Sequence, residues 1–457
     1  MDLASIKKVY IIGIKGSGIV GIAEILKSKG IEVTGSDTTE KFFTDEVLQR
    51  LGISYVEGFA IENIPSDVDL VLYAASYNEE NNIEVAEAKK RGLETIYYPK
   101  VLSELFNEKY GVAICGTHGK TTTSAMLAYI LDRMGENPTA IIGGRVRQWG
   151  SNAIVGQGEV FVLEADEYQN KLALYEPKAA ILTSVEYDHP DFYPTFEAYE
   201  QAFVDFVVKI PKSGFLAVWG DSVNTVAVAK NCTGDVVTYG YGEDNDFRIG
   251  NQVIEVTAQK FEIFHKEQSL GFFEIKLPGK HNALNALSVI VACYKLGLDM
   301  NQVREALSEF EGTTRRFELI GQRNGAILID DYGHHPEEVN VTLKAAREIY
   351  PEKNIIAVFH PHSYSRTAAL LHDFAQSFDG ADHVIVLDIY GSARENSGTV
   401  TSLDLVNLIN KYNRDKAEHI ATIDEVVESL QDKIGTNDVV ITIGAGNVFE
   451  VSHQLKQ

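Results

Sequence analysis

Residues 115–123 read CGTHGKTTT. A glycine-rich turn that leads into a helix offers backbone N–H groups to an anion, and such turns are typical of phosphate-binding sites. The common phosphate loop has the pattern G-x-x-x-x-G-K-[ST], and its first glycine would stand at position 114, which is Ile114 here. The flanking runs 111–115 and 124–135 favour a buried strand and an amphipathic helix. The sequence therefore predicts a phosphate loop with non-standard spacing.

The side chains of this loop have distinct expected roles. Lys120 would reach the outer phosphates, and the Thr121 hydroxyl would bind Mg²⁺. Magnesium prefers oxygen ligands, and Glu164 stands at the end of the next predicted strand. Because parallel strands deliver their carboxyl ends to one edge of a sheet, we expect Glu164 and His189 at the edge where Thr121 lies. The alternatives are a solvated strand end for Glu164 and an ordinary histidine for His189.

Composition restricts the classes of function. The chain has 457 residues, which suggests about three domains, and its formal net charge of −24 argues against nucleic-acid and anionic-membrane partners. Cys115, Cys232 and Cys293 lie far apart without a C-x-x-C motif, which favours a reducing compartment. No run approaches the roughly 18 apolar residues of a membrane span. We expect a cytoplasmic protein with small-molecule partners, no nucleic acid and no membrane.

Strand and helix signals alternate along the chain, which predicts an α/β fold. The first unit of this kind runs from a strand at 9–14 through a helix at 19–30 to a strand at 31–37. We expect a Rossmann-like N-terminal domain, a central P-loop-type ATPase domain with a mostly parallel sheet, and a C-terminal Rossmann-like α/β domain. Their expected bounds are 1–108, 109–311 and 312–457.

A second glycine loop, GIKGSG, occupies residues 13–18 and places Lys15 at its third position. Its order is G-x-x-G-x-G, which differs from the G-x-G-x-x-G of dinucleotide-binding folds. Asp37 follows about 20 residues later, where that fingerprint has a ribose-binding acid. The loop predicts a diphosphate ligand, either NAD or another nucleoside diphosphate. A tight strand–helix turn without a ligand is the alternative.

Histidines and arginines gather in two stretches of the last third, DDYGHHP (330–336) and HPHSYSRT (360–367), and each follows an apolar strand. Zinc is a poor fit, because the stretches contain neither H-E-x-x-H nor cysteine partners. Arg315, Arg316 and Arg366 offer bidentate contacts to a carboxylate or a phosphate. For Arg315 and Arg316 the alternative is surface charge at a domain hinge. The two stretches carry four histidines: His334, His335, His360 and His362.

Eight stretches, taken together and in this order, resemble the three-domain Mur ligases of peptidoglycan synthesis, and the resemblance spans nearly the whole chain. The stretches are GTHGKTTT (116–123), EADE (164–167), EYDH (186–189), PGKHNALNA (278–286), RRFE (315–318), DDYGHHP (330–336), PHSYSRT (361–367) and GAGN (444–447).

The resemblance implies a ligand for each domain. The N-terminal domain would hold a UDP-sugar, the central domain ATP and Mg²⁺, and the C-terminal domain the amino acid. The UDP-sugar residues would be Gly13, Lys15, Gly16, Ser17, Gly18, Asp37 and Ser76. The ATP residues would be Gly116, Thr117, His118, Gly119, Lys120, Thr121, Thr122, Asn282, Arg316 and Asp331. The amino acid and the reactive carboxylate would meet Tyr332, His334, His362 and Arg366. The metal ligands would be Thr121, Glu164 and His189, and the catalytic residues Lys120, Glu164, His189, His334 and Arg366.

The resemblance also implies a reaction. ATP would phosphorylate a carboxylate, and an amine would then displace the phosphate to form an amide. The motifs GIKGSGIVGIAE (13–24), GSD (35–37), DDYGHHP and DIYGSARE (388–395) look most like those of members that join L-alanine to UDP-N-acetylmuramate. Members that attach the tripeptide L-Ala-γ-D-Glu-diaminopimelate to the same nucleotide sugar are the alternative. A P-loop ATPase switch and an NAD-dependent oxidoreductase are rivals from other classes, but each leaves part of the motif set unused.

Three positions depart from the family pattern. Ser184 stands where asparagine is usual, Ser363 where many members carry arginine, and Asn82 where proline is usual. We expect a lost contact at Ser184 and at Ser363 and no effect at Asn82. Both His334 and His189 are candidates to take the proton of the amine. The sequence leaves the amine and the oligomeric state open.

Overall fold

The computed structural model describes residues 5–255, 258–391 and 398–456. The part of the DIYGSARE motif at 392–395 lies outside these residues. The chain divides into two units. The first unit comprises Met1–Glu186, Glu200–Phe247 and Ser288–Phe310, and the second comprises Tyr187–Tyr199, Arg248–Leu287 and Glu311–Gln457.

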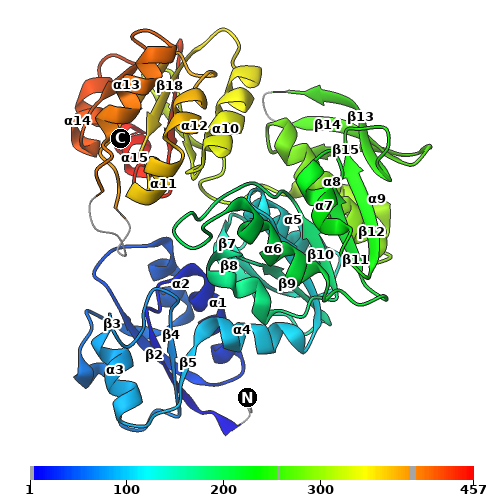
Figure 1. Cartoon of the computed structure of the whole chain (residues 1–457), viewed down its shortest axis with the longest axis vertical. Helices are drawn as coiled ribbons and strands as arrows, with labels where there is room; N and C mark the ends of the chain where they lie inside the picture. Colours follow the sequence, from blue (N-terminus) through cyan, green and yellow to red (C-terminus); the bar gives the residue numbers. More distant parts are fainter. Residues whose placement is uncertain (1–4, 256–257, 392–397, 457) are drawn as a thin grey trace. The chain divides into compact units, whose positions relative to one another are not determined.

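The first unit begins with a parallel sheet whose strands lie in the order β3-β2-β1-β4-β5 (Figure 1). The order places β1 at the centre, and its run of β-branched residues is buried, as a parallel strand covered on both faces requires. The elements are β1 (Lys8–Ile12), α1 (Ser17–Ser28), β2 (Glu32–Asp37), α2 (Phe43–Leu51), β3 (Ser54–Glu57), η2 (Ile61–Asn63), β4 (Leu70–Tyr73), α3 (Ile83–Lys90), β5 (Thr95–Tyr97) and α4 (Tyr98–Asn107).

A second sheet of this unit has β6 near its centre, in the order β12-β11-β10-β6-β9-β7-β8. The strands from β12 to β7 pair in parallel, and β8 returns antiparallel to β7. The carboxyl ends of β6 and β9 therefore lie side by side, at Cys115 and Glu164. The elements are β6 (Tyr110–Cys115), α5 (Lys120–Arg133), β7 (Thr139–Val146), β8 (Ser151–Ile154), β9 (Val160–Glu164), η3 (Tyr168–Leu174), β10 (Ala179–Leu182), α6 (Phe196–Val207), β11 (Phe215–Trp219), α7 (Val223–Ala229), β12 (Asp235–Gly240), α8 (Lys280–Lys295) and α9 (Met300–Glu309). The first residues of α6, up to Tyr199, and of α8, up to Leu287, belong to the second unit.

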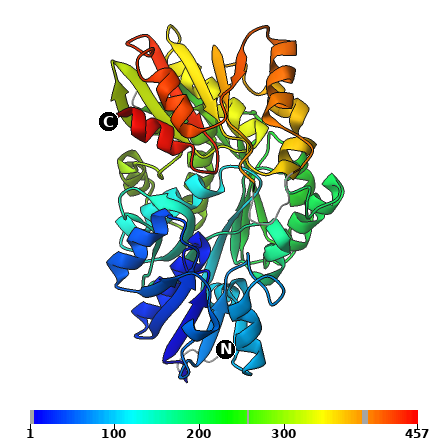
Figure 2. The same cartoon turned by 90° about the vertical axis from the view of Figure 1, so that its left-hand side faces the viewer.

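The second unit contains a sheet in the order β16-β17-β21-β18-β19-β20, which Figure 2 shows from the side in yellow to red. One core cluster packs α10, α12 and α13 on this sheet, and another packs α14 and α15 on it, so the sheet is covered on both faces. The elements are β16 (Glu318–Arg323), β17 (Ala326–Asp331), α10 (Pro336–Ile349), β18 (Asn354–Phe359), α11 (Tyr364–Ala369), α12 (Leu371–Gln376), β19 (His383–Val386), α13 (Ser402–Tyr412), β20 (Ala417–His419), α14 (Ile423–Leu430), β21 (Asp438–Ile443) and α15 (Phe449–Lys456). Also in this unit are most of β13 (Phe247–Ile254) and all of β14 (Gln259–His265) and β15 (Gln268–Ile275).

The predicted α/β class with mostly parallel sheets is confirmed. Two local predictions were wrong or incomplete. The apolar run at 179–189 (AAILTSVEYDH) predicts a strand over its whole length, but β10 ends at Leu182, because the residues after it bond the phosphate loop. The antiparallel pair β14–β15 was not predicted, although β14 alternates buried and more exposed residues as a half-buried strand does. Among the described residues, none of the helices has the length and apolar character that crossing a lipid bilayer requires.

Asn82 caps helix α3, so its replacement should loosen that helix. Its side-chain oxygen accepts hydrogen bonds from the amides of Glu84 and Val85. Removing such a cap costs about 1 kcal/mol. We expect Asn82→Ala to speed hydrogen exchange of these two amides about fivefold, as that free energy implies. Asn82→Asp keeps the acceptor and should exchange like the wild type, whereas unchanged exchange in Asn82→Ala would show that the cap has no energetic role.

Candidate active site

The first glycine loop leaves no room for side chains at two of its positions. A Cβ on Gly13, whose φ is +79°, would lie 2.7 Å from the Cβ of Ala74 and from the ring of Tyr77. A Cβ on Gly18 would lie 2.7 Å from the hydroxyl of Tyr98. Gly16 is the N-cap of α1, so no side chain of that residue covers the first amides of the helix. The geometry is that of a turn whose backbone a diphosphate can approach closely.

The ammonium group of Lys15 lies beneath this loop. The side chain is fully buried, and Nζ lies 3.2 Å from carboxylate oxygens of both Asp45 and Glu57. It also donates to the backbone carbonyls of Thr38, at 2.9 Å, and Glu40, at 3.0 Å. Lys15 is one of the residues predicted to bind the UDP-sugar. In this arrangement the Lys15 ammonium group holds the loop against α2 and β3. Only the backbone of Lys15 therefore faces a ligand at the loop.

Asp37 and Ser76 lie at carboxyl ends of strands of the same sheet. The buried Asp37 carboxylate accepts from the backbone amides of Lys15, at 2.6 Å, and Thr38, at 2.7 Å. Burial raises the pKa of this carboxyl, and the two amides and the Lys15 charge oppose the rise. Ser76 follows β4, and its carbonyl accepts from Asn81 at 3.0 Å. Asp37 therefore shapes the glycine loop directly.

The phosphate loop is fixed from one side by the segment that follows β10. A Cβ on Gly116, whose φ is +127°, would lie 2.3 Å from Oγ1 of Thr183. The Thr117 amide donates to the Ser184 carbonyl at 3.0 Å, and the His118 amide donates to the Ser184 hydroxyl at 2.9 Å. Ser184 thus contacts the phosphate loop through both its carbonyl and its hydroxyl. Gly119, with φ +79°, then begins α5 as its N-cap.

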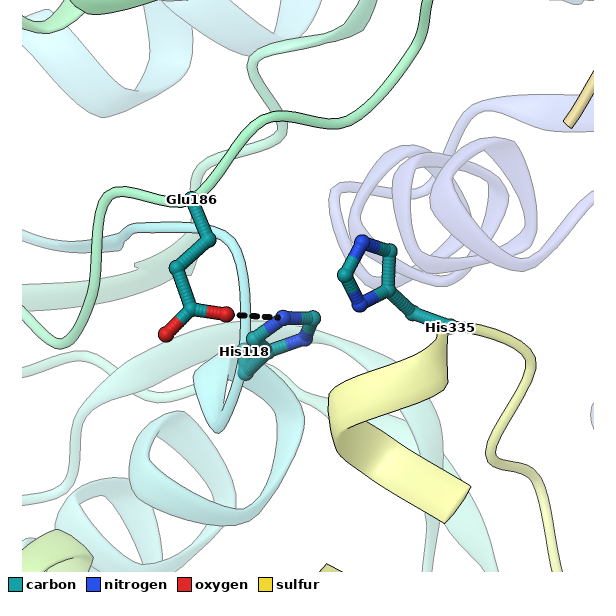
Figure 3. Close-up of side chains that lie close together, drawn as sticks. All are labelled: His118, Glu186 and His335. Atoms are coloured by element: carbon teal, nitrogen blue, oxygen red, sulfur yellow. Dashed lines mark ion pairs between the residues drawn. The ribbon is translucent and has the colours of Figure 1, made fainter. Parts of the chain in front are cut away.

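His118 and Glu186 form an ion pair at the rim of the phosphate loop (Figure 3). Nε2 of His118 lies 3.3 Å from a carboxylate oxygen of Glu186. The Glu186 backbone is itself held by Thr117, whose hydroxyl donates to the Glu186 carbonyl at 2.9 Å. The pair therefore fixes the His118 ring, which the sequence analysis placed in the ATP site.

Lys120 points back into its own loop. Nζ donates to the carbonyls of Gly116 and Thr117 and to the carboxylate of Glu167 at 2.9 Å. Burial alone would lower the pKa of Lys120, but the carboxylates of Glu167 and Asp166 raise it above its ordinary value. The group is a permanent cation enclosed by oxygen atoms, which a phosphate oxygen could replace. Glu167 was not singled out from the sequence, although it ends the EADE motif.

The predicted meeting of Thr121 and Glu164 is present. The Thr121 hydroxyl donates to Oε1 of Glu164 at 2.7 Å, and the Gly143 amide donates to Oε2. A Cβ on Gly143 would lie 2.7 Å from the Glu164 carboxylate, and one on Gly144 would lie 3.0 Å from Cγ2 of Thr121. A hydroxyl and a carboxylate at a phosphate loop are the hard oxygen donors that Mg²⁺ prefers. These residues fit the metal, and the glycine pair lets β7 approach them.

In the second unit, Arg366 is held by a carboxylate that the sequence analysis missed. Nε of Arg366 donates to Oδ1 of Asp188 at 3.2 Å, and the other oxygen lies 3.4 Å from an η-nitrogen. Burial would raise the pKa of Asp188, but Arg366, followed by His189, His335 and His334, holds it well below its ordinary value. Asp188 is the third residue of the EYDH motif, so the motif could have indicated it.

His334 is partly buried, with 22 % of its side chain exposed, and its ring is neutral at physiological pH. Desolvation lowers its pKa to about 3, against the opposing effect of Glu338. Nδ1 lies 3.2 Å from the Tyr332 carbonyl, and the ring packs on those of Tyr332 and His362 at 5.4 and 6.4 Å between centroids. A base of such low pKa is a weak proton acceptor near neutral pH. The arrangement favours His334 as a hydrogen-bonding group.

His335 and His360 also belong to the predicted cluster. His335 caps α10, because its Nδ1 accepts from the Glu337 amide at 3.4 Å. Burial lowers the pKa of His360 to about 4, and its ring packs edge-on against Tyr390. Ser363, with φ +75°, caps α11 and accepts from the amide of Arg366. These residues support the strand ends around Arg366.

The two arginines of RRFE differ in their partners. Arg315 donates to Asp330 at 2.9 Å and to the Gly444 carbonyl at 2.6 Å, so its fork is used within the fold. Arg316 lies 3.8 Å from Glu338 in a looser pair. Burial raises the pKa of Asp331 to about 6, while Arg316 opposes the rise. Of the two, Arg316 is therefore the better candidate to meet a ligand.

Two further predicted residues lie at helix starts, and a third, His189, lies in the loop after β10. Thr122 is buried in the first turn of α5. Asn282 is in the first turn of α8, where its amide donates to the Pro278 carbonyl at 2.6 Å. His189, with φ +56°, follows Asp188 and lies 3.7 Å from that carboxylate.

Three family models match the chain in succession. They are described as the Mur ligase family catalytic domain, over residues 8–110, the Mur ligase middle domain, over 114–293, and the Mur ligase glutamate ligase domain, over 315–446. A relative from Caldanaerobacter subterraneus is 39 % identical over 99 % of this chain and 98 % of its own. The chain belongs to the Mur ligase family.

That relative is named UDP-N-acetylmuramate–L-alanine ligase, and so is one from Desulfitobacterium hafniense, which is 38 % identical over 98 % of this chain and 99 % of its own. Among solved structures, the UDP-N-acetylmuramate–alanine ligase of Thermotoga maritima is similar with a TM-score of 0.83 and 26 % identity, covering 98 % of each chain. This Mur ligase thus shares its fold along its length with that protein.

Replacing the glycine at 143 should weaken metal-dependent nucleotide binding. A methyl group there would push the Glu164 carboxylate away from Thr121, since the gap is only 2.7 Å. We expect Gly143→Ala to weaken Mg²⁺–ADP binding about tenfold or more in calorimetry, as the loss of a charge-assisted contact implies.

Gly435→Ala is the matched control, because a Cβ there meets no atom within 4 Å. Its affinity should equal that of the wild type. Equal affinities in both variants would show that the Glu164 carboxylate is not a ligand of the metal.

Proposed function

We propose that this Mur ligase joins L-alanine to the carboxylate of UDP-N-acetylmuramate, with ATP as the energy source and Mg²⁺ as the cofactor. The observation that carries the proposal is the cluster of Lys120, Thr121 and Glu164 at the phosphate loop, in a chain so similar to proteins named for this reaction. Residues 1–108 would hold the UDP-sugar, 109–311 the ATP and 312–457 the amino acid. We propose the cytoplasm as the place of action.

The first step is phosphoryl transfer. A carboxylate oxygen of the nucleotide sugar attacks the γ-phosphorus of ATP, the bond to the bridging oxygen breaks, and ADP leaves. Lys120 would exchange Glu167 for phosphate oxygens and offset the charge of the transferred group. Magnesium bound by Thr121 and Glu164, with His189 as a third ligand, would neutralise phosphate charge. The product is an acyl phosphate, whose carbonyl carbon is a far better electrophile than that of a carboxylate.

The second step is attack by the amine. The nitrogen of neutral L-alanine bonds to the acyl carbon, the bond from that carbon to the phosphate oxygen breaks, and the proton lost from the nitrogen passes to the departing phosphate. Asp188 fixes the guanidinium plane of Arg366, which would contact the carboxylate or the oxyanion of the tetrahedral intermediate. Neutral His334 would orient the amino acid together with Tyr332 and His362. Water must be kept out, because it would hydrolyse the acyl phosphate.

Alternative functions have less support. Eight relatives that are 36 to 39 % identical are all named for L-alanine, which disfavours the tripeptide as the amine. An NAD-dependent oxidoreductase would leave Lys120 and Glu164 unused. A P-loop switch would hydrolyse ATP without an acceptor and would not need Arg366.

Phosphate release from Mg-ATP and UDP-N-acetylmuramate tests this proposal. We expect release with L-alanine and none without an amine or with the tripeptide L-Ala-γ-D-Glu-diaminopimelate. Release with the tripeptide but not with L-alanine would show that the protein ligates the tripeptide. Release without any amine would refute a ligase function.

Lys120→Ala should lower the rate of phosphate release with L-alanine about 100-fold or more, because it removes a preorganised charge from the phosphoryl group. Lys90→Ala, an exposed lysine on α3, should be fully active. Equal rates for both variants would remove the phosphate loop from the mechanism, provided that circular dichroism shows both to be folded.

A further inference from the structure

The hairpin of β7 and β8 lies against helix α1, the helix that begins at the first glycine loop (Figure 1). Gly21 of α1 packs so closely on β7 that a Cβ there would lie 3.0 Å from Ile141. The hairpin also carries Gly143, whose amide donates to Glu164. One small element therefore touches both the first glycine loop's helix and the carboxylate of the phosphate site.

Asn152, on β8, makes the link between these two places. Its Nδ2 donates to the carbonyl of Ser17, the first residue of α1, at 2.7 Å. The same nitrogen donates to the carbonyl of Ile142, which precedes Gly143, at 3.0 Å. The orientation of the amide is unambiguous, because the flipped group would set Oδ1 against two carbonyl oxygens.

The strand pairing is interrupted where Asn152 acts. Ile141 pairs with Ala153 and Val146 with Ser151, and the register shifts between these pairs. The Ile142 carbonyl thus receives a side-chain donor at the break in the ladder. The break frees the Gly143 amide to donate to Glu164.

An amide at position 152 has an energetic cost that its two hydrogen bonds must offset. The residue is fully buried, and its Oδ1 has no hydrogen-bond partner within the part of the chain that the structure describes. A buried polar atom left unsatisfied costs about 1–3 kcal/mol. An apolar residue would avoid this cost but would lose the bridge from Ser17 to Ile142.

We infer that Asn152 is a positioning residue that couples ligand binding at the first glycine loop to the placement of the Glu164 carboxylate. The inference rests on the proposed function, in which the loop holds a UDP-sugar and Glu164 serves Mg-ATP. A diphosphate at the start of α1 fixes the position of the Ser17 peptide group. Because Asn152 bonds the carbonyls of both Ser17 and Ile142, the Ile142 peptide is then fixed as well. The Gly143 amide, which follows it, holds Glu164 beside Thr121. The two ligands consequently bind with positive cooperativity, which is reciprocal.

Neighbouring contacts hold the hairpin but do not reach Glu164. The Ser151 hydroxyl donates to Glu24 of α1 at 3.2 Å, and Arg50 donates to the carbonyls of Trp149 and Gly150 at the turn. The Ser151 hydroxyl thus contacts α1, whereas the Ile142 carbonyl accepts from Asn152. Ser151→Ala is therefore a control that loosens the same hairpin without cutting the bridge.

Calorimetry on the full-length protein tests the inference. The affinity for Mg²⁺–AMP-PNP is measured with and without saturating UDP-N-acetylmuramate. In the wild type and in Ser151→Ala we expect the nucleotide sugar to tighten binding about tenfold, a usual size for such coupling. In Asn152→Ala the two affinities should be equal, while each ligand alone binds within about threefold of the wild type.

A second arm replaces Mg²⁺ by EDTA. The coupling should vanish in the wild type, because it runs through the carboxylate that holds the metal. If the alanine variant does not fold, Asn152→Ser takes its place, because serine keeps a hydrogen-bond donor of smaller reach. The coupling in this variant should be weaker than in the wild type but not absent.

Wild-type coupling in a folded Asn152 variant, or no coupling in the wild type although both ligands bind, would overturn the inference and leave the proposed function standing. Failure of the wild type to bind UDP-N-acetylmuramate would instead refute the proposed function, and the coupling with it.

Discussion

The carboxylate of Glu164 is the constraint around which the first unit is built. Its two oxygens accept from the Thr121 hydroxyl and the Gly143 amide, so three segments must meet at one point. Parallel pairing of β9 with β6 brings the carboxylate to the phosphate loop, and two glycines let β7 approach without a clash. In the proposed function, a carboxylate fixed in this way would need little reordering when metal and nucleotide bind, which reduces the cost of binding.

The two cations proposed to contact substrates are each paired with a carboxylate in the ligand-free protein. Lys120 lies on Glu167, and Arg366 lies on Asp188. A buried cation without a partner would be strongly destabilising, so the ligand-free protein needs these carboxylates. In the proposed reaction the phosphate and carboxylate groups of the substrates take over part of this role. Asp188 and Glu167 would then orient the cations for the incoming anions.

Much of the fold and part of the site could be predicted from sequence. The strand–loop–helix around Lys120 follows from local apolar periodicity, and the meeting of Thr121 with Glu164 follows from the rule that parallel strands end at one edge. These predictions depend only on short segments and on one general property of parallel sheets, so they can be made from a single sequence.

Other features depend on contacts between distant segments. A lysine in a glycine loop resembles a phosphate ligand, yet Lys15 turns inward because Asp45 and Glu57 of α2 and β3 receive it. Asp188 precedes Arg366 by a long stretch of chain, and no local pattern pairs them. Asn152 lies in a hairpin without a catalytic motif, and its role depends on a break in strand pairing that only the structure reveals.

The central claim is that ATP activates a carboxylate as an acyl phosphate. The most direct measurement uses UDP-N-acetylmuramate labelled with ¹⁸O in its carboxylate, together with Mg-ATP and L-alanine. Mass spectrometry of the released phosphate should show one labelled oxygen per phosphate, because the carboxylate oxygen that attacks phosphorus leaves with it. Phosphate without label, formed together with the amide product, would contradict the account.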